Sequence, residues 1–568
     1  MLLAVAHPAS AQVPPGIQNP VPQGSPIPRI LPPAPPSVAP GGLIAPPAAP
    51  SEALPAKPVN VRSVAVQGVT AYPLPEISQL TDGLVGPAVP LTRIDAARQA
   101  ILGRYRSDGY ILTTVSAALD ARGNLRFQVI EGHIANVKLD GDIGPAGVQV
   151  LRFLNRLTEE QPIDSMTLER YLLLAQDVPG VTLRATLQPS TEEPGALTLI
   201  ASVSRQAISG LATVDNRAFN QTGPIEAIGV LDFNSFTEFG ERTELSLYHA
   251  FPNSQTFGQG SFETFVGASG VRVRLYAGSG PSNPTGNLAE IGYSGVTTVF
   301  GGQASYPIVR SRQQNLSVYG TFDAVESTID TNTGPGGTSA LASFDSLRVV
   351  RLGADYAVSD LLLGDGRSAT TTATARISKG LSFLGASSYG AANAPRLGEQ
   401  PAFFKFNAEL SRTQTLFFPW DGASVALMGL LAGQVSPDVL PPEEEFFLGG
   451  SRITRGFYSG QVTGDNALAA TVELQLNTAL PVASIGVPWE VNAQFYAFYD
   501  WGETWQNQNT DRNGRLSSTG GGVRMAITKY TEVDFEGVAR LTRFPNGTGF
   551  GVSALNGGAF YWRVLARF

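Results

Sequence analysis

The chain has 568 residues, of which 62 are glycine and 15% are charged, and its net charge is −8. This charge provides no broad basic surface for nucleic acid, whose phosphates require clustered Lys and Arg. The absence of cysteine excludes disulfide bonds, thiolate metal sites and a cysteine nucleophile. No apolar run approaches the roughly 18 to 20 residues of a membrane-spanning helix, so a bilayer could be crossed only by a closed barrel.

The first 58 residues are not expected to form a packed domain. Residues 1–11 contain a short apolar stretch and then Ala9-Ser10-Ala11, which predicts the end of a signal peptide. The cationic start of such a peptide is missing, and an ordinary disordered terminus is the alternative. Proline recurs through residues 12–58 with few charged residues, which predicts an extended, disordered tether.

Residues 59–132 and 133–205 contain an internal repeat of about 70 residues. Each half predicts the order strand, helix, helix, strand, strand from its apolar periodicity. The expected elements are strands at 61–67, 111–119 and 124–130 with helices at 74–80 and 94–105, then strands at 134–139, 181–187 and 197–203 with helices at 148–157 and 166–175. We therefore expect two small α+β domains, each with two helices on one face of a sheet.

Residues 206–568 predict a transmembrane antiparallel β-barrel of about 16 strands. Segments of about 9 to 16 residues alternate between apolar and polar side chains, which suits tilted strands between lipid and a watery lumen. In 491–500, for example, Phe495 and Tyr499 fall on the expected lipid face, and Phe498 and Asp500 on the expected lumen face. A large soluble β protein is the alternative, but it would need a second sheet to cover the apolar faces.

The expected connections alternate between short turns and long loops. The long loops are expected at 330–343, 385–401 and 436–465. In outer-membrane barrels short turns lie on the periplasmic side. Both α+β domains and the C-terminal residue Phe568 are therefore expected on that side.

The loop at 436–465 contains a motif with a physical interpretation. A loop that dips into a lumen needs a fixed tip, and an Arg455 guanidinium paired with the Asp500 carboxylate would fix it directionally. Gly449, Gly450 and Gly456 would allow the backbone to turn and approach the wall closely. The adjacent aromatic side chains, Phe457 and Tyr458, could wedge the tip. An Arg455 exposed on a flexible loop is the alternative.

These residues resemble a known family, the two-partner secretion transporters (TpsB, or ShlB-FhaC-HecB, type) of the BamA-like superfamily. The segment Arg455-Gly456-Phe457 matches the tip motif of the sixth extracellular loop, and Phe498-x-Asp500-x-Gly502 matches its partner motif on the barrel wall. The resemblance implies two periplasmic POTRA domains and a barrel in the outer membrane, in contact with lipid and lipopolysaccharide as a monomer. The plug helix that the family often carries is in doubt, because 12–58 is too rich in proline.

The resemblance also implies a partner, a secreted exoprotein of the adhesin or haemolysin type. POTRA sheets commonly expose their second strand, to which an extended chain can add by backbone pairing. The expected edge is 111–119, and the client-binding positions would be Ile111, Thr113, Val115, Ala117 and Leu119.

Catalysis and cofactors are not expected. The three histidines, His7, His133 and His249, have no second ligand at metal spacing, and no phosphate loop or nucleophile motif is present. We therefore expect no catalytic residue, no metal and no cofactor. Export of a partner protein is the leading hypothesis, and the alternatives are an assembly factor for other outer-membrane proteins and a passive porin.

Overall fold

A computed structural model of the chain describes residues 58–190, 193–219, 222–252, 254–332, 337–364, 366–481, 490–545, 547 and 554–568. The predicted signal segment lies outside these residues, and so does the predicted tether apart from Pro58, which begins the first strand. Among the described helices, none combines the length and the apolar character needed to cross a bilayer.

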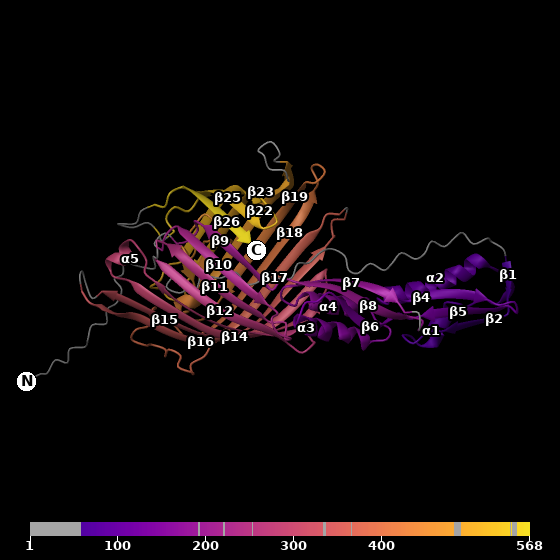
Figure 1. The fold of residues 1–568 in the computed structure, drawn as a ribbon. Helices are drawn as coiled ribbons and strands as arrows, with labels where there is room; N and C mark the ends of the chain where they lie inside the picture. Colours follow the sequence, from indigo (N-terminus) through magenta and orange to yellow (C-terminus); the bar gives the residue numbers. More distant parts are fainter. Residues whose placement is uncertain are drawn as a thin grey trace, which may run out of the picture.

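The first α+β unit packs helices on one face of a three-stranded sheet (Figure 1). Its elements are β1 (Pro58–Val61), β2 (Ser63–Gln67), α1 (Leu74–Gln79), β3 (Gly86–Pro90), α2 (Leu91–Ser107), β4 (Thr114–Leu119) and β5 (Asn124–Ile130). Helix α2 buries Ile94, Ile101 and Tyr105 on one stripe, as their spacing predicts. The pairing of β1 with β3 was not predicted, because strands of four or five residues are too short to show a period.

The second α+β unit repeats this arrangement. Its elements are β6 (His133–Asp140), α3 (Ala146–Leu154), the 3-10 helix η1 (Asn155–Thr158), α4 (Ser165–Gln176), β7 (Val181–Pro189) and β8 (Ala196–Arg205). Strand β8 pairs parallel with β6 and antiparallel with β7, as β5 pairs with β2 and β4. Helix α4 is capped at its N-terminus by Asp164, whose carboxylate accepts hydrogen bonds from the backbone nitrogens of Met166 and Thr167.

The rest of the chain forms a closed antiparallel barrel of 16 strands, which confirms the predicted fold class. The strands are β9 (Ile208–Asp215), β10 (Ile225–Asn234), β11 (Arg242–Phe251), β12 (Gln255–Val266), β13 (Val271–Ser282), β14 (Ser294–Arg310), β15 (Gln314–Asn332), β16 (Ser339–Asp360), β17 (Ala369–Gly380), β18 (Phe404–Phe417), β19 (Ser424–Val435), β22 (Asn466–Pro481), β23 (Glu490–Trp505), β24 (Gly514–Ala526), β25 (Thr531–Arg540) and β26 (Gly558–Arg567). The short helix α5 (Asn287–Glu290) lies between β13 and β14.

The seams between strands differ in length. Strands β15 and β16 pair along the whole of β15. The seam that closes the barrel joins β26 to β9 over only five residues of each strand, from Arg563 to Arg567 and from Leu211 to Asp215.

The side chains alternate between the two faces of the wall as predicted. Phe495 and Tyr499 are exposed on the outside, whereas Phe498 and Asp500 are buried inside. The same holds for β22, where Leu474 is exposed and its neighbour Glu473 is fully buried. The outside is thus apolar and the inside polar, as a bilayer requires.

The predicted loop at 330–343 is wrong. Strand β15 continues to Asn332 and β16 begins at Ser339, and Ile329 already pairs with Ser343. The Thr, Ser and Asp residues of this stretch look like a loop, but here they alternate along strands that extend well beyond the length needed to cross lipid.

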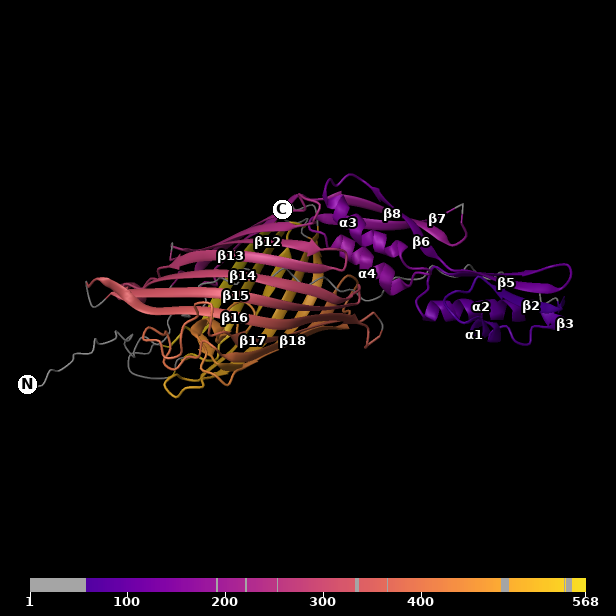
Figure 2. The same ribbon diagram turned by 90° about the horizontal axis from the view of Figure 1, so that it is seen from below.

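The second α+β unit is fixed to the barrel at its turn end (Figures 1 and 2). The Asp177 carboxylate binds Arg310 (Oδ1 to Nη2, 2.7 Å) and Arg272 (Oδ2 to Nη2, 3.1 Å), which flank two neighbouring turns. Arg205 donates a hydrogen bond to the carbonyl oxygen of Ser235, in a third turn. Because three turns are held at once, the second unit has a defined position relative to the lumen.

Candidate functional site

The loop at 436–465 runs back into the barrel and ends in a tight tip. It contains the 3-10 helix η2 (Pro442–Glu444) and the paired strands β20 (Phe446–Leu448) and β21 (Val462–Gly464). Gly449 and Gly450 lie at φ +105° and +101°, a region that favours glycine, and a Cβ on Gly449 would lie 1.9 Å from the Tyr458 oxygen. These two glycines allow the turn into the tip.

Arg455 is buried at this tip and is bound to Asp500 on β23. Its backbone nitrogen and its Nε donate to Asp500 Oδ2 at 2.8 and 3.0 Å, and its Nη2 donates to Oδ1 at 3.0 Å. The structure therefore brings together the two residues that the motif pairs. Both side chains are almost wholly removed from solvent, at 3% and 0% exposure, which makes the pair costly to break.

A second carboxylate completes the pocket for the Arg455 guanidinium. Glu473 on β22 binds Arg455 Nη1 and, from β24, Arg524 Nη1 at 2.7 Å. The ring of Phe498 lies beneath the Arg455 guanidinium carbon at 3.7 Å, and Tyr496 lies beneath that of Arg524 at 3.8 Å. Two arginines, two carboxylates and two aromatic rings thus form one network across three strands.

Gly456 approaches the wall so closely that only glycine fits. A Cβ at this position would lie 2.7 Å from Ser518 Cβ and 2.8 Å from Val538 Cγ1. Its backbone nitrogen donates to Ser518 Oγ at 3.3 Å, and its oxygen accepts hydrogen bonds from Arg540 and Tyr561. The tip is therefore held by its backbone as well as by Arg455.

The other predicted residues pack around the tip. Phe457 is 1% exposed within an apolar cluster that includes Leu448, and Tyr458 is half-buried with the Arg540 guanidinium 5.6 Å from its ring centre. A Cβ on Gly502 would lie 2.7 Å from Leu448, so this glycine makes room for the descending strand β20.

The base of the loop is anchored by separate ion pairs. Glu444 binds Arg351 (2.6 Å) on β16 and Lys405 (2.7 Å) on β18. Asp465, at the end of the loop, binds Arg396 at 2.9 Å, and Arg396 also binds Asp511 in the loop after β23. Both ends of the loop and its tip are thus fixed inside the barrel.

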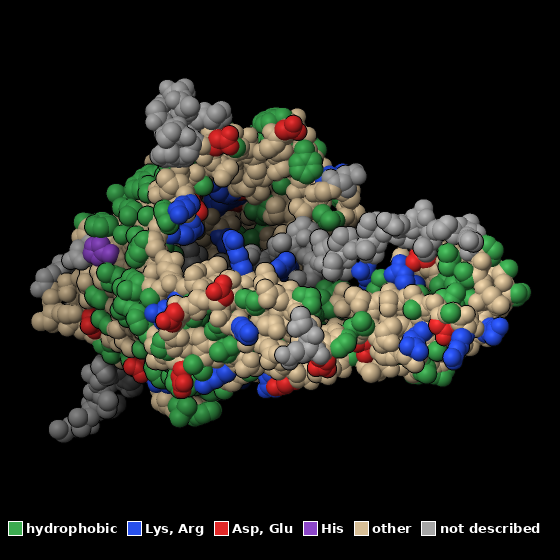
Figure 3. All heavy atoms as spheres, turned by 45° about the vertical axis from the view of Figure 1, so that its right-hand side comes forward, with side chains coloured by type: hydrophobic (Ala, Val, Ile, Leu, Met, Phe, Trp, Pro, Cys, Tyr) green, Lys and Arg blue, Asp and Glu red, His purple; other side chains and the backbone are tan. Residues whose placement is uncertain are grey.

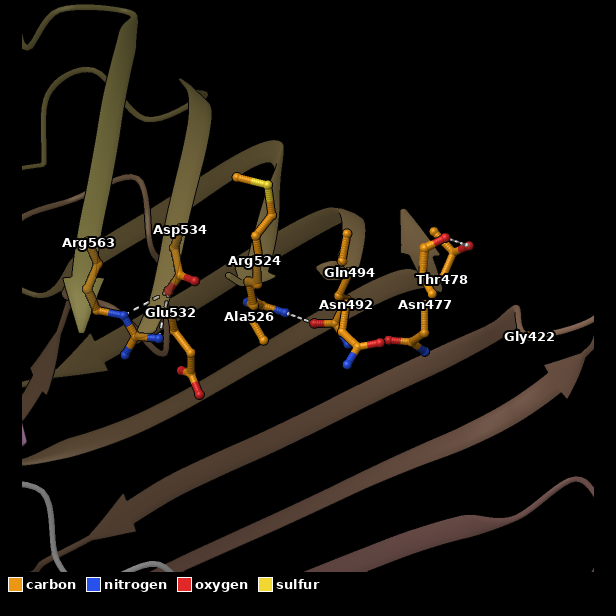
Figure 4. A pocket seen from close by; sticks show the side chains of 13 residues that line it. Gly422, Asn477, Thr478, Asn492, Gln494, Arg524, Ala526, Glu532, Asp534 and Arg563 are labelled. Carbon is orange, nitrogen blue, oxygen red and sulfur yellow. Dashed lines mark hydrogen bonds and ion pairs between the residues drawn. The ribbon is translucent and has the colours of Figure 1, made fainter. Parts of the chain in front are cut away.

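A polar cavity of about 430 Å³ lies between the tip and the turn end of β22–β26 (Figure 4). Its lining includes the amides of Asn477, Asn492 and Gln494, and Figure 4 shows Arg563 turned toward Asp534. Lys and Arg side chains gather around the hollow seen from the side of the α+β units (Figure 3). No group of carboxylate and histidine side chains in the described part of the chain is arranged to hold a metal ion.

The segment predicted to bind the client is only partly a strand. Strand β4 begins at Thr114, so Ile111 and Thr113 precede it, and Val115 faces the core at 7% exposure. Ala117 and Leu119 are exposed on the strand. Within the described residues β4 pairs with β5 alone, so it is an edge strand. The segment before it forms a turn, in which Leu112 packs against the core of the second unit.

The comparisons with known proteins agree with this geometry. Residues 199–525 match the family model of the haemolysin secretion/activation proteins ShlB/FhaC/HecB, and residues 59–132 match the ShlB-type POTRA domain. The heme/hemopexin transporter protein HuxB of Haemophilus influenzae (strain 86-028NP) is 21% identical over 79% of this chain and 77% of its own length.

Solved structures share the fold. CdiB from Escherichia coli superposes with a TM-score of 0.70 at 18% identity and covers 93% of this chain and 94% of its own. CdiB from Acinetobacter baumannii gives 0.61 at 17% identity, over 90% of each chain. Because the family model spans more than half of the 568 residues and includes the tip, its wall motif and most of the barrel, the chain belongs to the ShlB/FhaC/HecB family of haemolysin secretion/activation proteins.

Proposed function

We propose that this protein secretes a partner exoprotein of the adhesin or haemolysin type across the outer membrane. The POTRA domains capture the unfolded client in the periplasm, and the barrel conducts it outward. The observation that carries the proposal is the Arg455 tip, which is buried in the lumen and bound to Asp500 and Glu473. A loop anchored at this point shapes the path that a client must take, so export depends on the tip being seated.

The position of the second POTRA unit supports this route. Its contacts through Asp177 hold it against the turn end of the barrel at β13 and β14, and the amide-lined cavity lies on β22 to β26. Amide side chains can hydrogen-bond the backbone of any extended chain, so such a lining suits clients of different sequence. The edge strand β4 offers a first site at which an unfolded client can add by backbone pairing.

The apolar outside of the barrel supports its insertion in the outer membrane, in contact with lipid and lipopolysaccharide, as a monomer with a complete wall of its own. The turn end and both POTRA domains then face the periplasm. The function proposed is transport, with no catalytic step.

The proposal is tested with Arg455→Ala, expressed in cells that lack the natural copy. Truncation of one partner of a buried ion pair costs about 3–5 kcal/mol, so the tip should no longer seat and the exoprotein should fall at least tenfold in the medium. Arg452→Ala is the matched control, because Arg452 lies three residues away with 64% of its side chain exposed. Quantitative proteomics of the medium and of the outer membrane measures both variants.

Two outcomes would contradict the proposal. Normal secretion by Arg455→Ala with a folded barrel would show that the seated tip is not needed for export. Loss of many outer-membrane proteins after deletion, with the secreted proteins unchanged, would favour an assembly factor instead.

A further inference from the structure

A small polar cluster lies on the outer face of the barrel, where lipid-facing side chains are otherwise apolar. Val358, Thr371 and Arg412 are registered partners on β16, β17 and β18. Partners in antiparallel strands point to the same face, and that face repeats every second residue. Six residues away on each strand lie Leu352, Ile377 and Phe406, which are 63%, 45% and 37% exposed. Arg412 therefore points outward.

The members of this cluster are bound to one another. Arg412 forms a bidentate ion pair with Asp360, from Nη1 to Oδ2 at 2.8 Å and from Nη2 to Oδ1 at 3.0 Å. It also donates to Thr371 Oγ1 at 2.7 Å and to Gln414 Oε1 at 2.8 Å. The side chains of Arg412 and Asp360 remain 36% and 17% exposed, so both charges can be reached from outside.

The depth of the cluster in the bilayer can be estimated from a second charged residue that points outward on β16. Arg348 also points outward on β16 and binds Glu326 at 3.1 Å. Between Arg348 and Asp360 the outward positions are Val350, Leu352, Ala354, Tyr356 and Val358. Twelve steps of roughly 3.3 Å on a strand tilted by about 40° rise about 30 Å, the thickness of the hydrocarbon layer. The Asp360–Arg412 pair thus lies at the level of the headgroups on the turn side.

Large apolar side chains surround the pair at this level. Leu410 lies above it on β18, and Leu427, the registered partner of Gln414, lies beside it. Below it, the turn after β16 exposes Leu361, Leu362 and Leu363, and the end of β18 with the turn after it exposes Phe417, Phe418 and Trp420. Aromatic and aliphatic side chains at this depth contact the glycerol and upper acyl region of lipids.

We propose that this cluster binds the headgroup of a zwitterionic phospholipid that carries a primary ammonium, in the leaflet on the turn side. The Arg412 guanidinium, oriented by Gln414 Oε1 and with the Thr371 hydroxyl beside it, matches the phosphate, and the Asp360 carboxylate matches the ammonium. The two opposite charges of the pair complement the two opposite charges of the headgroup. The inference rests on the barrel spanning a bilayer and does not depend on which protein is exported.

The test is native mass spectrometry of the purified full-length protein. The protein is first mixed in detergent with equal amounts of phosphatidylethanolamine, phosphatidylcholine and phosphatidylglycerol, and the lipids that stay bound after release from the detergent are measured. The wild-type protein should retain phosphatidylethanolamine in preference to the other two. Arg412→Gln should weaken retention of phosphatidylethanolamine and phosphatidylglycerol about tenfold, the effect of one charged hydrogen bond. Asp360→Asn should remove the preference for the ammonium lipid and leave phosphatidylglycerol bound.

Arg563→Gln is a closely matched control. Arg563 pairs with Asp534 at 2.6 Å with side-chain exposures of 35% and 18%, nearly those of the outer pair, but this pair lines the lumen cavity. Unchanged lipid retention in Arg412→Gln, or an equal loss in Arg563→Gln, would overturn the proposal. If Arg412→Gln does not form a heat-modifiable barrel, the double variant Thr371→Val and Gln414→Leu tests the same site and leaves the ion pair in place. Secretion is measured separately, so failure of lipid binding leaves the export proposal standing.

Discussion

Arg217 Nη1 donates a hydrogen bond to the backbone oxygen of Arg455 at 3.2 Å. Arg217 lies two residues after the end of β9, and its Nη2 also binds Glu536 at 2.6 Å. The preceding residue, Asn216, donates to the oxygen of Phe560 and accepts from the nitrogen of Trp562, both on β26. One short segment therefore holds the loop tip and fastens the closing seam.

Arg217→Ala should loosen the tip without unfolding the barrel. The change removes the bond to Arg455 and leaves Glu536 without its arginine partner, at 4% exposure. Planar-bilayer recordings should show a larger fraction of time in high-conductance states. Arg567→Ala serves as the control, because Arg567 binds Glu532 in a pair that is 47% and 33% exposed. Identical recordings for both variants would disprove the coupling.

Gly456→Ala should prevent the tip from seating. The added methyl group would meet Ser518 and Val538 below 3 Å, and such overpacking costs about 1–3 kcal/mol. Protease digestion of the folded barrel should cut the loop faster than in the wild type. Gly537→Ala changes a glycine on the same strand as Val538, β25, where a methyl group meets no atom within 4 Å. Equal digestion of the two variants would show that the close approach is unimportant.

Asp177→Ala should detach the second α+β unit from the turn end. It leaves Arg310, only 8% exposed, without its carboxylate and should cost about 3–5 kcal/mol of docking. Distances between spin labels on the unit and the barrel should broaden. Glu159→Ala breaks the Arg156 pair of the same unit, which is 45% and 58% exposed, and should leave the distances sharp. An unbroadened distribution in Asp177→Ala would contradict the docking role.

Acid should weaken the first POTRA unit through Glu131. Burial has the largest effect and alone would raise the pKa of Glu131, but hydrogen bonds from Thr70, Tyr105 and Ala71 outweigh it and lower this pKa. The stabilisation is fully present above the ordinary value of 4.5 and is lost as the pH falls through the lowered pKa.

The measurement for Glu131 is amide exchange at residues 70–71, corrected for the intrinsic rate at each pH. Protection in the wild type should fall below pH 4.5, and Glu131→Gln should show weak protection at every pH. A wild-type protection that does not change with pH would refute the role of the carboxylate.

The sequence predicts which face of the barrel wall a side chain occupies better than it predicts which side chains come into contact. Period-two alternation places Asp500 and Glu473 on the lumen side, and the motif spacing joins Asp500 to Arg455. It does not show that Glu473, Arg524 and Arg217 converge on the same tip, because this depends on the register between strands and on closure of the barrel. Alternation along β18 likewise places Arg412 on the face of Phe406 and Leu410, but its proximity to Thr371 and Asp360 follows only from the register between strands.

The short seam makes the C-terminal residue part of the closure. Phe568 exchanges two backbone hydrogen bonds with Gly210, at 3.0 and 3.1 Å, next to the five paired residues. The other strand pairs of the wall can stay hydrogen-bonded while β26 separates from β9. The barrel therefore has a weak seam between its last strand and its first. Removing Phe568 would leave only the five paired residues to hold β26 against β9.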